Sequence, residues 1–142
     1  MNNRVVQTTE NVAEIDKCMA EKEMVRLRLL PQGIIFAPLD ISPAIVLHTQ
    51  HRAIASGHHR NMAAMKDVIS FFTGSPADSL EVIRRRGADY VAICPDMPEM
   101  HNYAKGSPDG LWGQISRGVT PPWLVPIKIQ GAQTFKVWRV VK

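Results

Sequence analysis

The sequence predicts a single α/β domain, in which a small mixed sheet of parallel strands plus a C-terminal β-hairpin carries helices packed on it. Three observations support this fold class. The chain has 142 residues, a usual length for one domain. Its 45% hydrophobic and 21% charged residues are ordinary for a globular protein. Short apolar runs alternate with segments of helical periodicity, until the last two apolar runs follow each other directly.

The limits of the domain follow from the polarity of the two ends. Residues 1–10 are polar and are expected to form a flexible N-terminus, whereas residues 11–142 form the single domain. The N-terminus lacks the apolar core of a signal peptide, and the longest apolar runs fall short of the ~20 residues that cross a bilayer. We therefore expect the polypeptide to be soluble as given.

In the N-terminal half the patterns predict, in order, a helix over 11–29, a buried strand over 33–37, a short helix over 44–47 and a short strand over 52–55. Pro31 and Gly33 end the first helix. Ser42 can cap the short helix and Pro43 suits its first position. A strand is nearly as plausible for that short stretch, because it is so apolar.

In the C-terminal half the patterns predict, in order, helices over 61–72 and 75–86, a strand over 90–94, a loop over 95–110, one or two helical turns over 111–117, and strands over 124–129 and 134–140. In the first helix Met62, Met65, Val68, Ile69 and Phe72 fall on one face, which we expect to be core. The first strand is nearly all apolar, as parallel strands covered on both faces are. The last two strands, with a glycine between them, form the hairpin.

Charge and cysteine usage narrow the classes of partner. The net charge is a mild +4, and the most basic run, 84–86, ends a predicted helix, where positive side chains complement the helix dipole. No aromatic residues interleave with it as a surface for single-stranded nucleic acid needs, so we expect no nucleic-acid partner. Cys18 and Cys94 fit neither a metal-ligand pattern nor a disulfide framework. One bridge between them is possible, but two buried free thiols are the favoured interpretation.

The densest polar cluster lies between a predicted strand end and a predicted helix start. It consists of His58, His59, Arg60 and Asn61, and Asp40 follows the preceding strand. In open α/β sheets ligands bind beyond the carboxyl ends of the strands, and the free N–H groups of a helix N-terminus attract anions. Arginine adds a fork suited to carboxylate or phosphate, and histidine titrates near neutral pH. These five residues predict a small site for an anionic or polyol group.

Other interpretations of these residues stay open. Asn61 can act as a helix cap only, with its basic neighbours bonding loop carbonyls. Adjacent histidines on an extended segment point to opposite sides, so we expect no metal site, and the sequence indicates no cofactor. A small hydrolase using His59 with Asp40 is a minor alternative, because no serine nucleophile has a strand–turn–helix context. Asp96 and Glu99 lie in the predicted loop after the 90–94 strand and are expected to be solvated.

Several short runs together resemble a known type of domain. They are Leu30–Asp40, Pro43–Ile45, His51–Arg52, His59–Asn61 and Ala88–Val91, and the similarity extends to Gly118, Pro122–Leu124 and the terminal hairpin. The pattern resembles the soluble domain that follows the transmembrane helices in bacterial multi-spanning membrane proteins of the GT-C glycosyltransferase type. These are relatives of the protein O-mannosyltransferases and the oligosaccharyltransferases. The resemblance covers most of the chain after residue 25.

This resemblance implies a domain that has no catalytic activity on its own. In oligosaccharyltransferases the turn after the first strand carries a Trp-Trp-Asp-Tyr-Gly motif that recognises the acceptor peptide, and the matching segment here, 38–42, keeps only Asp40. The catalytic carboxylates of such enzymes lie in loops between membrane helices, so the chain alone is expected to be non-catalytic. The resemblance implies a periplasm-facing domain that helps bind an acceptor or lipid-linked sugar, beside the transmembrane portion of a parent protein or a membrane partner. The alternative is a free-standing cytosolic binding or interaction module with no sugar chemistry.

Overall fold

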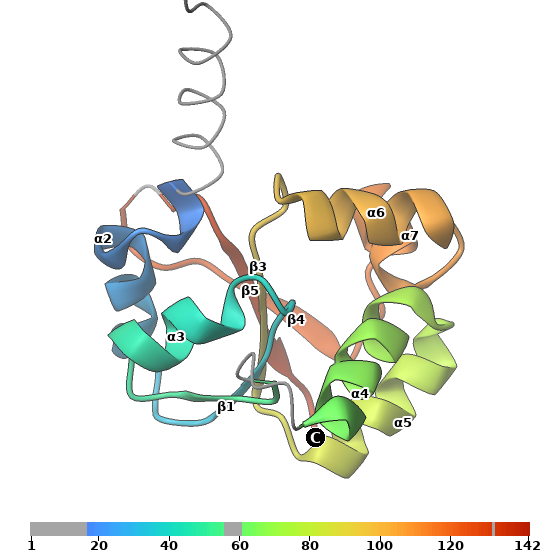
Figure 1. The fold of residues 1–142 in the computed structure, drawn as a ribbon, viewed down its shortest axis with the longest axis horizontal. Helices are drawn as coiled ribbons and strands as arrows, with labels where there is room; N and C mark the ends of the chain where they lie inside the picture. The colour runs from blue at the N-terminus through green and yellow to red at the C-terminus, as the bar shows by residue number, and fades with distance from the viewer. Residues whose placement is uncertain (1–16, 56–60, 132) are drawn as a thin grey trace, which may run out of the picture.

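The computed structural model describes residues 17–55, 61–131 and 133–142. A five-stranded mixed sheet lies between two layers of helices (Figure 1). The strands are β1 (Ile34–Phe36), β2 (Arg52–Ala53), β3 (Tyr90–Ile93), β4 (Leu124–Ile127) and β5 (Lys136–Val140). The helices are α2 (Glu21–Met24), the 3-10 helix η1 (Val25–Leu29), α3 (Ser42–His48), α4 (Met62–Thr73), α5 (Pro76–Arg86), α6 (Pro98–Gly106) and α7 (Leu111–Ser116). The predicted fold class is confirmed.

The sheet combines parallel and antiparallel pairing in the order β2-β1-β3-β5-β4. β1 pairs in parallel with β2 and β3, and β5 pairs antiparallel with β3 and β4. The predicted C-terminal hairpin is confirmed, with Leu124 opposite Val140. Gly131, in the connection between its strands, has φ of +94°, which glycine adopts without a steric penalty.

β3 divides the hydrophobic core into two layers. Val91 and Ile93 pack in one cluster with residues of α4, α5, α6 and α7. Tyr90 and Ala92 pack in the other cluster with residues of α2, η1 and α3. All four residues of β3 are buried, because successive side chains of a strand point to opposite faces and both faces are covered.

The buried face of α4 differs from the predicted one. Val68 and Phe72 are buried as expected, but Met62 is 75% exposed and Ile69 is 43% exposed. Phe71 is buried instead, with its ring centroid 4.4 Å from that of Phe36 at the end of β1. The α4 sequence is apolar almost all round, so periodicity alone does not decide which face turns inward.

Three local predictions were wrong. The predicted loop over 95–110 contains α6, which begins at Pro98 and buries Met100 against the first core cluster. The predicted helix over 11–29 is interrupted at Ala20, which has an extended backbone, and it ends as a 3-10 helix. Ser42 does not cap α3 but lies within it, and its hydroxyl donates to the Pro38 carbonyl at 2.8 Å. The sequence over 95–110 contains proline and polar residues, which are typical of loops. Such residues also occur at the start of helices, so the sequence pattern did not distinguish α6 from a loop.

A disulfide joins Cys18 to Cys94, so the interpretation of two free thiols was wrong. The two Cα atoms are 6.0 Å apart although the two cysteines are 76 positions apart in the sequence. The bond ties the helical turn 17–19 to the carboxyl end of β3. Two cysteines carry no framework pattern, so their proximity depends on the tertiary fold and not on spacing.

A half-buried carboxylate ties α4 to α5. Asp67 accepts two hydrogen bonds from the Arg85 guanidinium, at 2.9 and 3.0 Å, and one from Arg86 Nε at 2.6 Å. The hydrogen bonds from Arg85 lower the pKa of the Asp67 carboxyl, outweighing the opposing effect of burial. Two of the three arginines in the basic run thus serve the packing of two helices.

Loss of the disulfide is expected to destabilise the domain strongly. For a loop of 76 residues, the chain-entropy contribution is about 4 kcal/mol. Replacing both Cys18 and Cys94 by alanine should lower the free energy of unfolding by roughly that amount, measured by urea denaturation. Reductant should destabilise the wild-type protein and leave the double variant unchanged. Equal urea midpoints for oxidised and reduced protein would contradict this expectation.

The Asp67 interaction predicts a defined pH dependence. Asp67→Asn should cost roughly 1–2 kcal/mol of unfolding free energy near neutral pH, because hydrogen bonds to a charged group are lost. The folded pKa of Asp67 lies below the ordinary value of 3.8. The difference in unfolding free energy between the wild type and the variant is therefore fully present above pH 3.8 and disappears as the pH falls through the folded pKa. Urea denaturation of both proteins across acidic pH measures it, with the exposed Asp78→Asn as the control. A gap that persists at the most acidic pH would refute the assignment.

Candidate functional site

The carboxyl ends of β1 and β3 form a topological switch point. The two strands are parallel neighbours, but the chain leaves β1 for α3 and leaves β3 for α6, which cover opposite faces of the sheet. In open α/β sheets ligands bind in the crevice where connections diverge in this way. The candidate site is therefore the rim formed by the β1–α3 turn and the first turn of α6.

Glu99 holds the β1–α3 turn in place. Its two carboxylate oxygens accept hydrogen bonds from consecutive backbone amides, Leu39 N–H at 2.9 Å and Asp40 N–H at 2.8 Å. The expectation that Glu99 is a solvated loop residue was wrong, because it lies in the first turn of α6 and reaches across the switch point. The Asp40 side chain stays exposed above this fixed turn.

Tyr103 supports the same carboxylate from the next turn of α6. Its hydroxyl donates to Glu99 Oε2. Burial raises the pKa of the Tyr103 hydroxyl, and the hydrogen bond to Glu99 and the charge of Asp40 raise it further. The phenol therefore keeps its proton and remains a donor. The rim thus presents the exposed carboxylate of Asp40. The turn that carries it is held by the Glu99 carboxylate, which in turn is held by the Tyr103 hydroxyl.

The structure separates the two described members of the predicted site. Asp40 follows the carboxyl end of β1, whereas Asn61 caps α4, its Oδ1 accepting from Ala64 N–H at 3.3 Å. Phe71, near the other end of α4, packs on Phe36 at the end of β1. Asn61 precedes Phe71 by ten helical residues, a rise of roughly 15 Å along the helix. In Figure 1 the C-terminal end of α4 lies toward α6 and α7, and its start lies at the far end.

A two-helix crossover explains this separation. α5 leads directly into the start of β3, so α5 runs antiparallel to the strands. α4 packs antiparallel to α5 through a short turn at Gly74, so α4 runs with the strands and begins at their amino edge. The sequence hypothesis instead placed the start of this helix at the carboxyl edge.

The remaining predicted residues, His58, His59 and Arg60, lie outside the described residues. Among those that are described, no group of three histidine, cysteine or acidic side chains could hold a metal ion. His51 is buried with both ring nitrogens occupied, since Nδ1 accepts from Gly33 N–H at 3.2 Å and Nε2 lies 2.7 Å from the Leu27 carbonyl. Its role is structural, because it ties η1 to the start of β1.

Comparison with known proteins identifies the fold. No protein-family model matches this chain, and no curated protein matches it. The crystal structure of the C-terminal globular domain of an oligosaccharyltransferase from Archaeoglobus fulgidus superimposes with a TM-score of 0.60, covering 82% of this chain and 91% of that chain. The fold is similar to that of an oligosaccharyltransferase C-terminal domain. At 13% sequence identity the similarity is one of fold. Over residues 17–55, 61–131 and 133–142, the structure contains no helix that is long and apolar enough to cross a membrane.

The contact between Glu99 and the turn generates a local prediction. Glu99→Gln removes the charge and leaves one acceptor oxygen for two amides, so the Leu39 and Asp40 amides should open more often. We expect their hydrogen exchange to accelerate roughly tenfold, since hydrogen bonds to a charged group are lost. Residue-level exchange measured by NMR tests this, and the exposed Glu21→Gln provides the matched control. Unchanged protection of both amides would show that Glu99 does not hold the turn.

Proposed function

We propose that this chain is the non-catalytic, periplasm-facing domain of a membrane glycosyltransferase. Its carboxyl edge around Asp40 helps bind an acceptor or a lipid-linked sugar. The partner is then the transmembrane portion of a parent protein or a membrane protein of that type. The observation that carries the proposal is the shared fold with an oligosaccharyltransferase C-terminal domain, which extends over most of both chains.

The geometry of the switch point supports a binding role for Asp40. Its side chain is exposed at the edge where open α/β sheets bind ligands, and Glu99 fixes its backbone amide. An exposed carboxylate on a fixed turn can accept hydrogen bonds from sugar hydroxyls or acceptor amides with little loss of conformational entropy. Asp40 is also the position that matches the aspartate of the acceptor-recognition motif in the resembling family.

The disulfide supports the periplasmic placement over the cytosolic alternative. Disulfides persist in oxidising compartments such as the periplasm and are rare in the reducing cytosol. Cys18 and Cys94 are both buried, and their bond stabilises the edge of the sheet that carries the proposed site.

The segment from His58 to Asn61 enters the proposal separately. Because Asn61 lies at the amino edge, a single sugar ring cannot contact both Asn61 and Asp40. Binding by His58, His59 and Arg60 remains a prediction from the sequence, because these three residues lie outside the described part of the chain.

Ligand-observed NMR tests the binding role directly. We expect saturation transfer from the protein to N-acetylglucosamine or mannose, and Asp40→Asn should weaken the binding roughly tenfold through loss of charge-assisted hydrogen bonds. Asp78→Asn, an exposed change on α5, should leave the transfer intact. If neither sugar receives saturation, or if Asp40→Asn binds like the wild type, sugar binding at this edge is refuted.

A further inference from the structure

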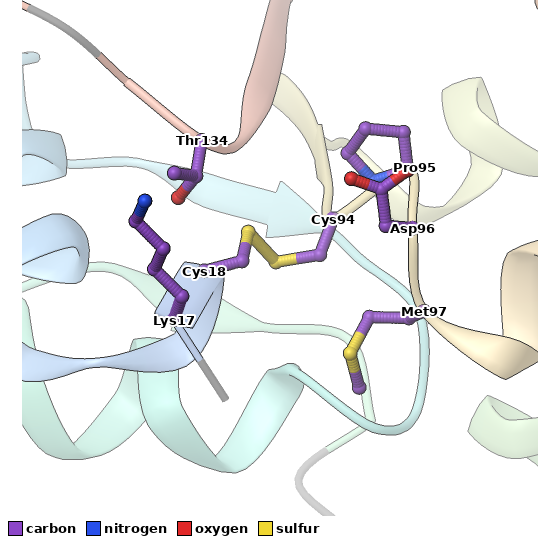
Figure 2. Close-up of a pocket in the computed structure, with 7 residues that line it drawn as sticks. All are labelled: Lys17, Cys18, Cys94, Pro95, Asp96, Met97 and Thr134. Carbon is purple, nitrogen blue, oxygen red and sulfur yellow. A yellow bond between two sulfur atoms is a disulfide. The ribbon is translucent and has the colours of Figure 1, made fainter. Parts of the chain in front are cut away.

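A second feature of the carboxyl edge is a hollow of about 190 Å³ above the Cys18–Cys94 disulfide (Figure 2). Besides the two cysteines, it is lined by Lys17, Pro95, Asp96, Met97 and Thr134. Three segments distant in sequence form it: the helical turn 17–19, the β3–α6 loop and the residues that lead into β5. The hollow is separate from the Asp40 turn, so the inference below does not rest on the proposed function.

The hollow carries two charges of opposite sign. Lys17 and Asp96 are both exposed and lie on either side of the disulfide in Figure 2. Within the described part of the chain, neither enters an ion pair. The two charged side chains that line the hollow are therefore of opposite sign, and their charges sum to zero.

The other residues that line the hollow are held in place by packing or by hydrogen bonds. Some of them are apolar, and Thr134 provides a hydrogen-bond acceptor. Cys94 is 1% exposed and Met97 is 5% exposed, so the floor is well packed. Thr134 is anchored by Glu23, whose Oε1 accepts from the Thr134 N–H at 2.7 Å and from its hydroxyl at 2.9 Å. Because that hydroxyl already donates its proton, it offers a ligand only an acceptor.

The Thr134 anchor is itself charged. Burial raises the pKa of the Glu23 carboxyl, but the hydrogen bonds from Thr134 and Arg26 outweigh burial and lower it. Glu23 therefore stays ionised, and Thr134 stays in place. The hollow thus offers one donor, the Lys17 ammonium, and two acceptors, the Asp96 carboxylate and the Thr134 hydroxyl.

Size and charge together select a class of ligand. At ~30 Å³ per water, the hollow has the volume of roughly six waters, which suits a molecule much smaller than a typical drug. A simple anion is attracted by Lys17 and repelled by Asp96, and a simple cation meets the reverse. A small molecule that carries both charges can interact favourably with both side chains. We propose that this hollow binds a small zwitterion of the amino-acid class, its carboxylate on Lys17 and its ammonium on Asp96.

Three probes that differ by one charged group test the proposal on the oxidised, full chain. They are L-valine, 3-methylbutanoate, which lacks the ammonium, and 2-methylpropylamine, which lacks the carboxylate. L-valine should shift the backbone amide resonances of Cys94, Asp96 and Thr134. It should bind at least roughly tenfold more tightly than either analogue, since each analogue loses one charge-assisted contact. Equal binding of either analogue, tighter binding of glucose, or no shift up to the solubility of L-valine would overturn the proposal.

Two variants locate the binding in this hollow. Lys17→Met and Asp96→Asn should each weaken L-valine binding roughly tenfold. Both residues are exposed, so the urea midpoint should stay unchanged. Lys22→Met and Asp78→Asn, exposed changes outside the hollow, should bind L-valine like the wild type. If the hollow variants keep wild-type affinity, L-valine binds elsewhere and the assignment fails.

Discussion

Strand β3 constrains the rest of the structure because it is buried on both faces and paired on both edges. Its side chains alternate between the two core clusters, and its backbone pairs with β1 on one side and β5 on the other. The direction of β3 fixes the edge at which the preceding crossover must arrive and the following loop must leave. The disulfide, the first turn of α6 and the hollow all gather at its carboxyl end for that reason.

At this carboxyl end, two carboxylates, one half-buried and one buried, hold neighbouring groups in place. Glu99 fixes the turn beneath Asp40, and Glu23 fixes Thr134 beside the hollow. In both cases the acceptor is a carboxylate and the donors include backbone amides, which makes the hydrogen bonds stronger than those between neutral groups. The exposed side chains above them differ in what they offer. Asp40 presents a single negative charge, whereas Lys17 and Asp96 present a pair of opposite charges.

Much of the fold was predictable, since the element order apart from α6, the buried β3 strand and the hairpin follow from apolar runs and turn residues. The buried face of α4 was not, because its sequence is apolar nearly all round and only the contact of Phe71 with Phe36 decides it. The position of Asn61 could have been inferred, since two consecutive helices between parallel strands require the first to start at the amino edge. The roles of Cys18 and Glu99 could not, because both depend on partners about 60 or more residues away that only the tertiary fold brings near.

The long separation between Cys18 and Cys94 also sets an order of events during synthesis. At about 5–20 residues per second, the ribosome needs roughly 4–15 s to advance the 76 positions from Cys18 to Cys94. For that interval the N-terminal thiol has left the ribosome without its partner. The hairpin strand β5, which completes the pairing of β3, follows later still. The sheet can therefore be completed only after β5 has been synthesised, and the disulfide joins an early segment of the domain to the end of its central strand.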